Sequence, residues 1–513
     1  GFVTLVTTSE SLYNRFTYGQ RNPEAVRRFA DFMLQDTEET KHLFLVGRAV
    51  TFPDVLKAWQ EQDLVPSYGY PGSDVLLTAG TGARDIDVQG MSTGRLNVTN
   101  NEEIMAYLAK VQETEAAPKG QAWKKRMLHL SGGKTPIEIS SLAQILENIE
   151  TRAEKFNLGG QVSSQRKQSL EEIEETDISA AVNQGLGMIT FAGHGSANVI
   201  DLNIGYCSDP TKGFNNKGKY PLMFFNGCGV GNVFYRYDPL TTDWLLTPEK
   251  GAIAVFANSF WSYLLPTQIY LNSLYEKLFV DAQTINLSLG EIQQAVNKEL
   301  ALIKGNPYVL ANMHQMVLQG DPAIKMFPLA AADFAALEEG MFLKSTDLSK
   351  PMNQNDSLWL SVPVQNLGRF DSTQLVTIRT DMDGNGSRAS SETILPSFAF
   401  EKTIRVKVPN VISLTKVTLT LNPDKNLDEL TFDNNAASLS FDNWQETGAY
   451  TSFPDNSIPD KVGPLLTVVI NGKQIENGDY IAANSEIQAT LIDENAFSSG
   501  DENYVKMYLA GAD

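Results

Sequence analysis

The sequence predicts an α/β head followed by all-β sandwich domains, and three observations carry this prediction. Up to Pro328, short apolar runs that end in Gly-rich turns alternate with amphipathic helical segments, a pattern typical of βαβ units and a parallel sheet. After Pro328, helical periodicity gives way to alternating β runs. Finally, a chain of 513 residues is too long for one hydrophobic core, so we expect two to four domains.

We expect four segments along the chain. Residues 1–120 form a first α/β subdomain of the head, and residues 121–328 form a second one. Residues 329–446 form a small antiparallel sandwich of the immunoglobulin-like or adhesion type. Residues 447–513 contain a linker and the start of a further β domain, which we expect to be truncated at the end of the chain.

In the head, the apolar runs predict buried strands and the segments between them predict helices. Besides the runs that begin at Ile189 and Leu222, strands are expected at Phe2–Thr7, His42–Gly47, Arg126–Leu130, Gly251–Ala257 and on both sides of a Gly-Asp-Pro turn within Met316–Phe327. Helices are expected from Pro23 and Glu24 onward, and at Asn101–Ala116, Ile139–Phe156, Glu171–Gln184, Gln268–Val280 and Leu289–Lys304.

In the second half, alternation of apolar and polar residues predicts strands. The sandwich strands are expected at Leu358–Val364, Leu375–Thr380, Ile404–Val408 and Val417–Leu421. A segment rich in Pro, Asp, Ser and Asn follows at Trp444–Pro464 and reads as a linker. The last β domain begins with Leu465–Ile470, Tyr480–Ala482 and Ile487–Ile492.

Composition and charge exclude several classes of function. The net charge of −20 and the pI of about 4.7 argue against nucleic-acid binding, which needs a basic face, and against electrostatic docking on anionic lipid. No apolar run reaches the roughly 20 residues of a membrane span. The first residues show no basic segment before a long apolar core, so we expect a processed start rather than a signal peptide.

The stretch Ile189–Asn232 contains the candidate chemistry. His194 and Cys228 each follow a short apolar run and sit in a Gly-rich turn. Because residues just past the carboxyl ends of parallel strands face the ligand crevice, we expect the imidazole and the thiol to share one crevice. A thiol at pH 7 is only about a few per cent thiolate and needs a base, so this pair is typical of a cysteine nucleophile.

The backbone of the same two turns offers a site for a developing negative charge. We expect the N–H groups of Gly195 and Cys228 to form an oxyanion hole. The alternative interpretations are a buried Cys acting as a small hydrophobe and a Gly-His-Gly segment that is only a tight turn. Cys207 lies in a polar loop and is expected to be a bystander, since a Cys207–Cys228 disulfide would consume the nucleophile. No cofactor is required by this chemistry.

Four other features have simpler interpretations beside them. Asp381, Asp383, Asn385 and Glu392 fit the spacing of a calcium-binding loop, but a hairpin turn explains them about as well. We also expect Asp74 to lie in a surface turn, Arg95 to form a buried structural ion pair, and His42 to be a solvated residue at a strand start.

Three blocks of the sequence resemble those of a known family. The blocks Phe-Ala-Gly-His-Gly-Ser (191–196), Phe-Phe-Asn-Gly-Cys-Gly (224–229) and Leu-Gln-Gly-Asp-Pro-Ala-Ile-Lys (318–325) resemble the gingipain family of cysteine peptidases, which have a caspase-like fold. Segments 65–74 and 92–96 also match family blocks, so the resemblance covers about residues 1–328. It implies a Cys–His dyad and a substrate pocket near Ser259, Trp261 and Ser262.

The sequence departs from the family pattern at one position that matters. The resemblance implies an acidic partner for the histidine just after the strand that ends in Ser131-Gly132-Gly133. No carboxylate stands there, and the nearest one in sequence is Glu138, which we consider as the third member. Without such a partner the orientation of the imidazole would be weaker, and activity would be low or altered.

The β domains after the head narrow the resemblance to the PorU-type sortases of the type IX secretion system. Segment 422–435 resembles the closing strand of adhesion-type sandwich modules. This resemblance implies an enzyme at the bacterial cell surface, on the outer membrane or secreted, that removes the C-terminal signal domain from secreted cargo. It also implies lipopolysaccharide as an amine acceptor and other outer-membrane secretion proteins as partners. The alternative is an inactive peptidase-like module that serves binding or adhesion.

Overall fold

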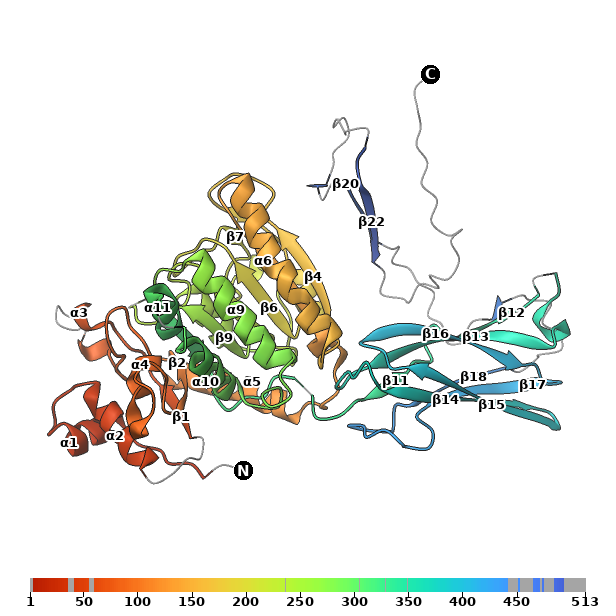
Figure 1. The fold of residues 1–513 in the computed structure, drawn as a ribbon, viewed down its shortest axis with the longest axis horizontal. Helices are drawn as coiled ribbons and strands as arrows, with labels where there is room; N and C mark the ends of the chain where they lie inside the picture. Colours follow the sequence, from red (N-terminus) through yellow and green to blue (C-terminus); the bar gives the residue numbers. More distant parts are fainter. Residues whose placement is uncertain are drawn as a thin grey trace, which may run out of the picture. The chain divides into compact units, whose positions relative to one another are not determined.

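The structure of the chain is a computed structural model in which the residues 3–35, 41–54, 60–235, 237–303, 305–327, 329–347, 349–441, 451–452, 465–470, 473–474 and 484–492 are described. The chain divides into two compact units. The first, which we call the head, contains residues 1–330 and 368–370, and the second, the β unit, contains residues 331–367 and 371–513. Each is described by itself (Figure 1).

One eight-stranded sheet runs through the head and includes strands from both predicted subdomains. Its strands, in spatial order, are β1 (His42–Val46), β2 (Ser92–Leu96), β10 (Met316–Gln319), β9 (Ala254–Asn258), β8 (Leu222–Asn226), β6 (Met188–Ala192), β3 (Arg126–Ser131) and β4 (Gln161–Arg166). All neighbours are parallel except β9 and β10, which pair antiparallel. The sheet is therefore mixed, with three strands running one way and five the other.

Helices cover both faces of this sheet. They are α1 (Ser9–Phe16), α2 (Glu24–Leu34), α3 (Phe52–Asp54), α4 (Val75–Thr78), α5 (Asn101–Ala116), α6 (Pro136–Lys155), α7 (Ser179–Gln184), α8 (Leu240–Leu246), α9 (Leu264–Phe279), α10 (Leu289–Leu300) and α11 (Pro307–Gln315). Figure 1 shows α6, α9, α10 and α11 side by side over the sheet. One core lies beneath these helices and α5, and a second core on the opposite face involves α7 and α8.

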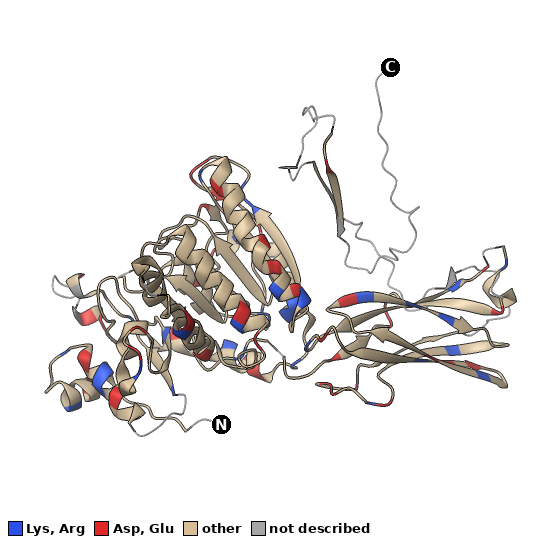
Figure 2. Cartoon of the chain, in the orientation of Figure 1, with Lys and Arg blue, Asp and Glu red and all other residues tan. Residues whose placement is uncertain are grey.

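The central strands are buried on both faces, which explains their composition. Along β6 and β8, alternate residues enter the two cores: Met188 and Phe224 belong to the first, whereas Ile189 and Phe225 belong to the second. Neither strand contains a charged residue, and the colours in Figure 2 place the charged residues of the head mostly on its helices. Strands of this kind read as continuous apolar runs rather than as alternating ones.

Three predictions for the head are wrong. Residues 3–7 form no strand, and Val3, Leu5 and Val6 are exposed because no strand of the described chain pairs with them. The predicted helix Glu171–Gln184 is helical only from Ser179, since Glu174 and Glu175 form β5, which pairs with β7 (Leu202–Asn203). The segment after Gly320 is a turn rather than a strand, and its carbonyls at Pro322 and Ile324 accept N–H groups from the start of α10.

The β unit consists of two packed antiparallel sheets and a small third one. The first sheet contains β11 (Phe334–Ala336), β12 (Phe342–Ser345), β13 (Ser357–Asn366), β16 (Glu401–Pro409) and β19 (Thr451–Ser452). The second contains β14 (Leu375–Gly384), β15 (Ser387–Pro396), β17 (Leu414–Leu421) and β18 (Ala436–Ser440). The third contains β20 (Leu465–Ile470), β21 (Lys473–Gln474) and β22 (Ile487–Ile492).

All four strands predicted for the sandwich lie within observed ones, and one apolar core fills the space between the first two sheets. Most of the predicted linker at Trp444–Pro464 and the predicted strand Tyr480–Ala482 lie outside the described residues. Among the described helices, none is long and apolar enough to cross a membrane.

Candidate active site

The two Gly-rich turns that carry His194 and Cys228 touch each other. Strands β6 and β8 are parallel neighbours, with Ala192 opposite Asn226, so both turns leave the same edge of the sheet. A Cβ placed on Gly227 would lie 3.3 Å from the carbonyl carbon of His194. The turns thus approach so closely that a side chain at position 227 would crowd the neighbouring backbone. The expected juxtaposition of the two strand ends is present.

A carboxylate lies behind the imidazole, and it is that of Glu138. The Oε1 atom of Glu138 lies 2.7 Å from Nε2 of His194. Glu138 occupies the first turn of α6, where Thr135 caps the helix and accepts a hydrogen bond from its backbone N–H at 3.2 Å. Its second oxygen accepts the N–H of Lys134 at 2.8 Å. The carboxylate is therefore held by the helix cap and directed at the histidine.

These contacts keep Glu138 charged. Burial raises the pKa of its carboxyl, but the hydrogen bonds from Lys134 and from the His194 ring outweigh burial and leave the pKa below its usual value. An ionised Glu138 accepts a hydrogen bond from Nε2–H, so the neutral imidazole carries its hydrogen on Nε2. Its Nδ1, which has no hydrogen-bond partner within the described residues, is then the nitrogen available as a base.

Asp201 orders the backbone of the histidine turn, a role that the sequence analysis did not predict. Its carboxylate accepts the N–H of Gly133 at 2.7 Å and the N–H of His194 at 3.1 Å. A Cβ on Gly132 would lie 2.0 Å from the same carboxylate, so glycine leaves the room that Asp201 occupies. Burial raises the pKa of Asp201, against the lowering by these two N–H groups. This role depends on three turns, those of Gly133, His194 and Asp201, that come together only in the folded chain.

The thiol of Cys228 contacts the backbone of Ser262. Its Sγ lies 3.5 Å from the N–H nitrogen of Ser262 and 3.7 Å from the carbonyl oxygen. Ser262 precedes helix α9, and its hydroxyl donates to Asn226 at the end of β8 and lies 3.0 Å from Thr267. No hydrogen bond joins Cys228 to His194 among these described side chains. Catalytic hydrogen bonds are often absent before substrate binds, so the missing contact does not exclude a dyad.

The two N–H groups predicted for the oxyanion hole have no partner within the described residues. A short antiparallel bridge joins Gly195 to Ile200, but its hydrogen bonds run from Ser196 to Val199 and from Asp201 to His194. The N–H of Gly195 is therefore not used by this bridge. The N–H of Cys228 is likewise unpaired, whereas that of Gly229 donates to Phe260 at 2.7 Å. The nitrogen of Gly195 lies 3.2 Å from where a Cβ of Gly227 would be. Both donors thus belong to the two touching turns.

The predicted pocket residues differ in what they do. Ser259 is buried, and its hydroxyl donates to the carbonyl of Gly72 at 2.8 Å, so it braces two loops rather than lining an open pocket. Trp261 is 60% exposed, and its ring stacks on Phe260 at 5.1 Å between ring centres. Ser262 contacts the thiol through its backbone. Of the three, Trp261 is the side chain that presents an exposed surface next to the backbone that contacts Cys228.

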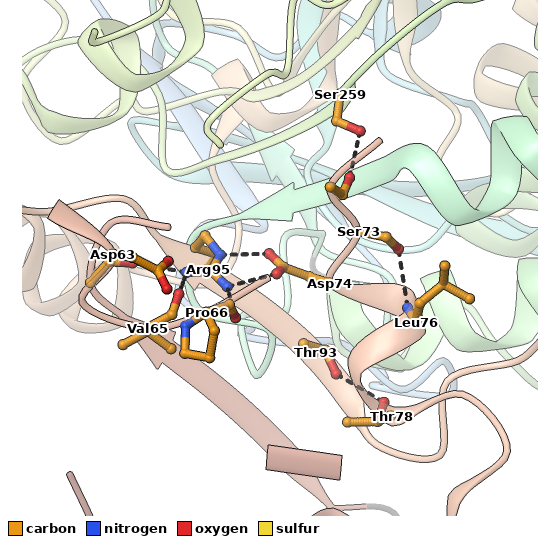
Figure 3. A network of polar contacts seen from close by, with 12 residues as sticks. Asp63, Val65, Pro66, Ser73, Asp74, Leu76, Thr78, Thr93, Arg95 and Ser259 are labelled. Atoms are coloured by element: carbon orange, nitrogen blue, oxygen red, sulfur yellow. Dashed lines mark hydrogen bonds and ion pairs between the residues drawn. The ribbon is translucent and has the colours of Figure 1, made fainter. Parts of the chain in front are cut away.

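Asp74 and Arg95 form one buried ion pair with each other, which corrects the expected surface turn at Asp74. Nε and Nη2 of Arg95 bind the two carboxylate oxygens at 2.8 and 2.7 Å. Its other donors bind the carbonyls of Gly47, Val65 and Pro66 at 2.9 to 3.1 Å, so all five N–H groups are used (Figure 3). The pair fixes segment 65–74, which holds Ser259 through Gly72.

The sequence assigns His42 and Cys207 no role in the site, and their contacts agree with this. The ring of His42 lies at the start of an edge strand, with Nδ1 2.9 Å from the hydroxyl of Ser92. Both cysteines are free, and Cys207 is buried in the second core of the head. Burial raises the pKa of the Cys207 thiol to about 12. This thiol is therefore unsuited to act as a nucleophile at neutral pH.

The residues that fitted a calcium loop lie along a β-hairpin. Strands β14 and β15 pair from Leu375 opposite Pro396 to Gly384 opposite Ser387, and Asn385 lies in the turn. Asp383 binds Arg388 at 2.7 Å, whereas Glu392 binds Arg379 at 2.8 Å farther along the hairpin. The structure therefore does not bring Asp381, Asp383, Asn385 and Glu392 together, and no group of three or more metal-ligating side chains occurs among the described residues.

Comparison with known proteins places the chain in a family. The sequence profile of peptidase family C25 matches residues 1–327. Among solved structures, the crystal structure of the Arg-specific cysteine proteinase gingipain R (RgpB) matches at 13% identity and a TM-score of 0.51, covering 82% of this chain and 88% of that one. A search of curated proteins found no match.

A second solved structure, the complex of the pro- and mature domains of Porphyromonas gingivalis RgpB, matches at 14% identity and a TM-score of 0.53. It covers 84% of this chain and 92% of that one. At such identities the two structures support the caspase-like gingipain fold with additional antiparallel sheets, and the family profile supports the chemistry. The chain belongs to peptidase family C25, the gingipain family of cysteine peptidases.

Proposed function

We propose that the chain is an endopeptidase in which Cys228 is the nucleophile, His194 the base and Glu138 the residue that positions the histidine. The contact that carries this proposal is the 2.7 Å bond between Glu138 and Nε2 of His194, on a turn that touches the turn of Cys228. It provides the acidic partner that the sequence did not show after β3. It also leaves Nδ1 as the free nitrogen of the ring.

The reaction follows from these positions. After rotation of its side chain, Cys228 gives its proton to Nδ1 of His194, and the sulfur attacks the carbonyl carbon of the scissile peptide bond. The carbonyl oxygen becomes an anion that accepts the N–H groups of Gly195 and Cys228. When the C–N bond breaks, Nδ1 returns the proton to the leaving amine. The product is a thioester between Cys228 and the amino-terminal part of the substrate.

The backbone around Ser262 favours the charged form of the sulfur. The N–H of Ser262 already points to the thiol at 3.5 Å. Ser262 lies two residues before α9, a helix of 16 residues, and the positive end of the helix dipole stabilises a nearby anion. Water, or an amine, then attacks the thioester with His194 as the base, and the two acceptors lead to hydrolysis or to transfer.

We further propose that the enzyme is a sortase-type peptidase of type IX secretion. It would act at the cell surface, on the outer membrane or in secreted form, remove the C-terminal signal domain of secreted proteins, and pass some cargo to an amine of lipopolysaccharide, together with other outer-membrane secretion proteins. The support is that a gingipain-like head followed by β domains resembles the PorU-type sortases. Incubation of cargo with and without an amine acceptor tests this form, because a transferase yields the amine adduct whereas a hydrolase yields only the free acid.

We predict that a peptide carrying a thiol-reactive group labels the chain once, at Cys228. Cys207 serves as an internal control, because its thiol is buried and burial raises its pKa to about 12. The label is located by mass spectrometry of the digested protein. Labelling of Cys207 alone, or equal labelling of wild type and Cys228→Ala, would refute the proposed nucleophile.

The alternative function, an inactive binding or adhesion module, has one observation in its favour. The thiol contacts Ser262 rather than His194 in this structure. The sequence also favoured this alternative, because no acidic partner for the histidine was evident. Glu138 removes that argument, since its carboxylate contacts Nε2 of His194. An inactive module would bind the peptide probe reversibly without forming a thioether, so the same experiment separates the two functions.

A further inference from the structure

Four segments of the loops around Cys228 lack charged residues, although Asp201, Arg236 and Asp238 follow farther along two of these loops. Segments 66–73, 193–200, 227–235 and 258–265 include no Asp, Glu, Lys or Arg. In the whole chain, one residue in five is charged. Loops at a protein surface are ordinarily polar, so four uncharged segments that converge on one thiol call for an explanation in terms of what binds there.

These loops instead expose aromatic and aliphatic side chains. Trp261 stacks on Phe260, and the ring of Tyr70, which is 66% exposed, lies 6.1 Å from that of Phe260. Next in sequence, Tyr263 packs edge-on against Tyr308 at 4.9 Å, and both are exposed. The neighbouring Leu264 and Leu265 are also about half exposed. We call the set Tyr70, Phe260, Trp261, Tyr263, Leu264, Leu265 and Tyr308 the aromatic shelf.

The shelf lies directly beside the nucleophile. The carbonyl of Phe260 accepts the N–H of Gly229 at 2.7 Å, and the backbone of Ser262 contacts Sγ of Cys228. Trp261 lies between these two anchored residues, so its ring is one residue from a backbone that touches the thiol. Tyr70 is held by the segment that the Arg95–Asp74 pair fixes. The shelf is thus a firmly placed surface next to the reacting bond.

Four carboxylates near the site already have partners within the described residues. Glu138 binds His194 and the N–H of Lys134. Asp201 accepts two backbone N–H groups, and Asp74 binds Arg95. On the loop after Cys228, Asp238 binds Arg48. A guanidinium or ammonium group at the shelf would contact aromatic faces but no opposite charge. Such contacts compensate poorly for the hydration that the cation loses.

We infer that the shelf selects an uncharged, apolar side chain on the residue whose carbonyl Cys228 attacks. This inference rests on the proposed function and specifies the class of its substrates: peptides with Phe, Leu or a similar residue before the cleaved bond, rather than Arg or Lys. The Arg-specific proteinase that shares the fold differs in this respect. Trp261 is the residue expected to determine the selectivity.

Five peptides that differ only in the residue before the cleaved bond test the inference on the full chain. With Phe or Leu at that position, kcat/KM is expected to exceed the values for Arg and Glu at least about tenfold, and the Ala peptide is expected to lie between. Trp261→Ala is expected to reduce the ratio of Phe to Ala about fivefold or more. Tyr18→Asn removes an exposed aromatic residue elsewhere in the head, at a positive φ that Asn tolerates, and leaves the ratio unchanged.

Binding of the same peptides to Cys228→Ala separates this inference from the proposed function. If the wild type cleaves none of the peptides while Cys228→Ala binds Phe and Leu peptides more tightly than Arg peptides, the catalytic proposal fails and the shelf stands. If the Arg peptide is cleaved or bound as well as the Phe peptide, or if Trp261→Ala leaves the Phe-to-Ala ratio unchanged, the inference is overturned.

Discussion

Replacing Glu138 by glutamine lowers kcat by about 10²- to 10³-fold with little change in KM, because the histidine loses its orientation and its favoured tautomer. The glutamine oxygen can still accept the N–H of Lys134, as Glu138 does at 2.8 Å, so the start of α6 is preserved. Its amide group, however, donates to Nε2 and shifts the ring hydrogen to Nδ1. Glu138→Gln is therefore expected to be at least as inactive as Glu138→Ala.

The pH dependence provides a second test of the same residue. Because the pKa of Glu138 lies below its ordinary value of 4.5, the stability that its charge contributes is present above that value and is lost only as the pH falls through the lowered pKa. From about pH 5.5 to about 8.5 the carboxylate does not titrate. The carboxylate is therefore ionised throughout this range, and kcat of Glu138→Gln is expected to lie below that of the wild type at every pH within it.

Glu147→Gln is the matched control, since Glu147 is an exposed carboxylate on the same helix. It should leave kcat within about a factor of two of wild type, as expected for a surface change away from the site. Values of kcat for Glu138→Gln and Glu138→Ala that also lie within this factor would show that the carboxylate does not take part.

Replacing Arg95 by alanine is expected to lower the free energy of unfolding of the head by about 3–5 kcal/mol. The substitution leaves the carboxylate of Asp74 buried without its partner and removes the donors for the carbonyls of Gly47, Val65 and Pro66. Arg95→Lys should also destabilise the head, because an ammonium group cannot bind five acceptors in one plane. Asp74→Ala leaves a buried, unpaired guanidinium and should cost a similar amount.

The buried thiol of Cys207 allows this loss to be measured in the head alone. In a Cys228→Ala background, Cys207 is the single cysteine and is fully buried, so its modification in increasing urea follows opening of the head. Arg152→Ala, which removes a partly exposed contact to Glu276 at 3.3 Å, is the control and should cost at most about 1 kcal/mol. An Arg95→Ala variant as stable as this control would contradict the structural role of the pair.

Much of the site follows from local patterns in the sequence. The apolar runs before His194 and Cys228 are β6 and β8, and because parallel neighbours end at one sheet edge, their pairing brings the two turns together. The helices at Asn101–Ala116 and around Ile139–Phe156 were predicted within a few residues of their ends, since each has a capping residue and a regular apolar face.

Other features depend on contacts between distant segments and left no local trace. Glu138 was visible only as the nearest carboxylate, because Thr-Pro-Ile-Glu at 135–138 is also a common helix start. The role of Asp201 depends on room left by Gly132, and the pairing of Asp74 with Arg95 depends on the path of segment 65–74. Residues 171–178 have helical composition, yet pairing of Glu174 and Glu175 with β7 prevails there.

The central claim is that peptide bonds are cleaved through a thioester on Cys228, and acid quenching of a cleavage reaction tests it most directly. A poor peptide ester substrate that acylates faster than it hydrolyses lets the intermediate accumulate, and mass spectrometry of the intact and digested protein locates it. We predict an added mass equal to the acyl part of the substrate, on Cys228 in the wild type and absent from Cys228→Ala. An acyl group on Cys207 or on no cysteine, in a protein that cleaves the ester, would contradict the claim.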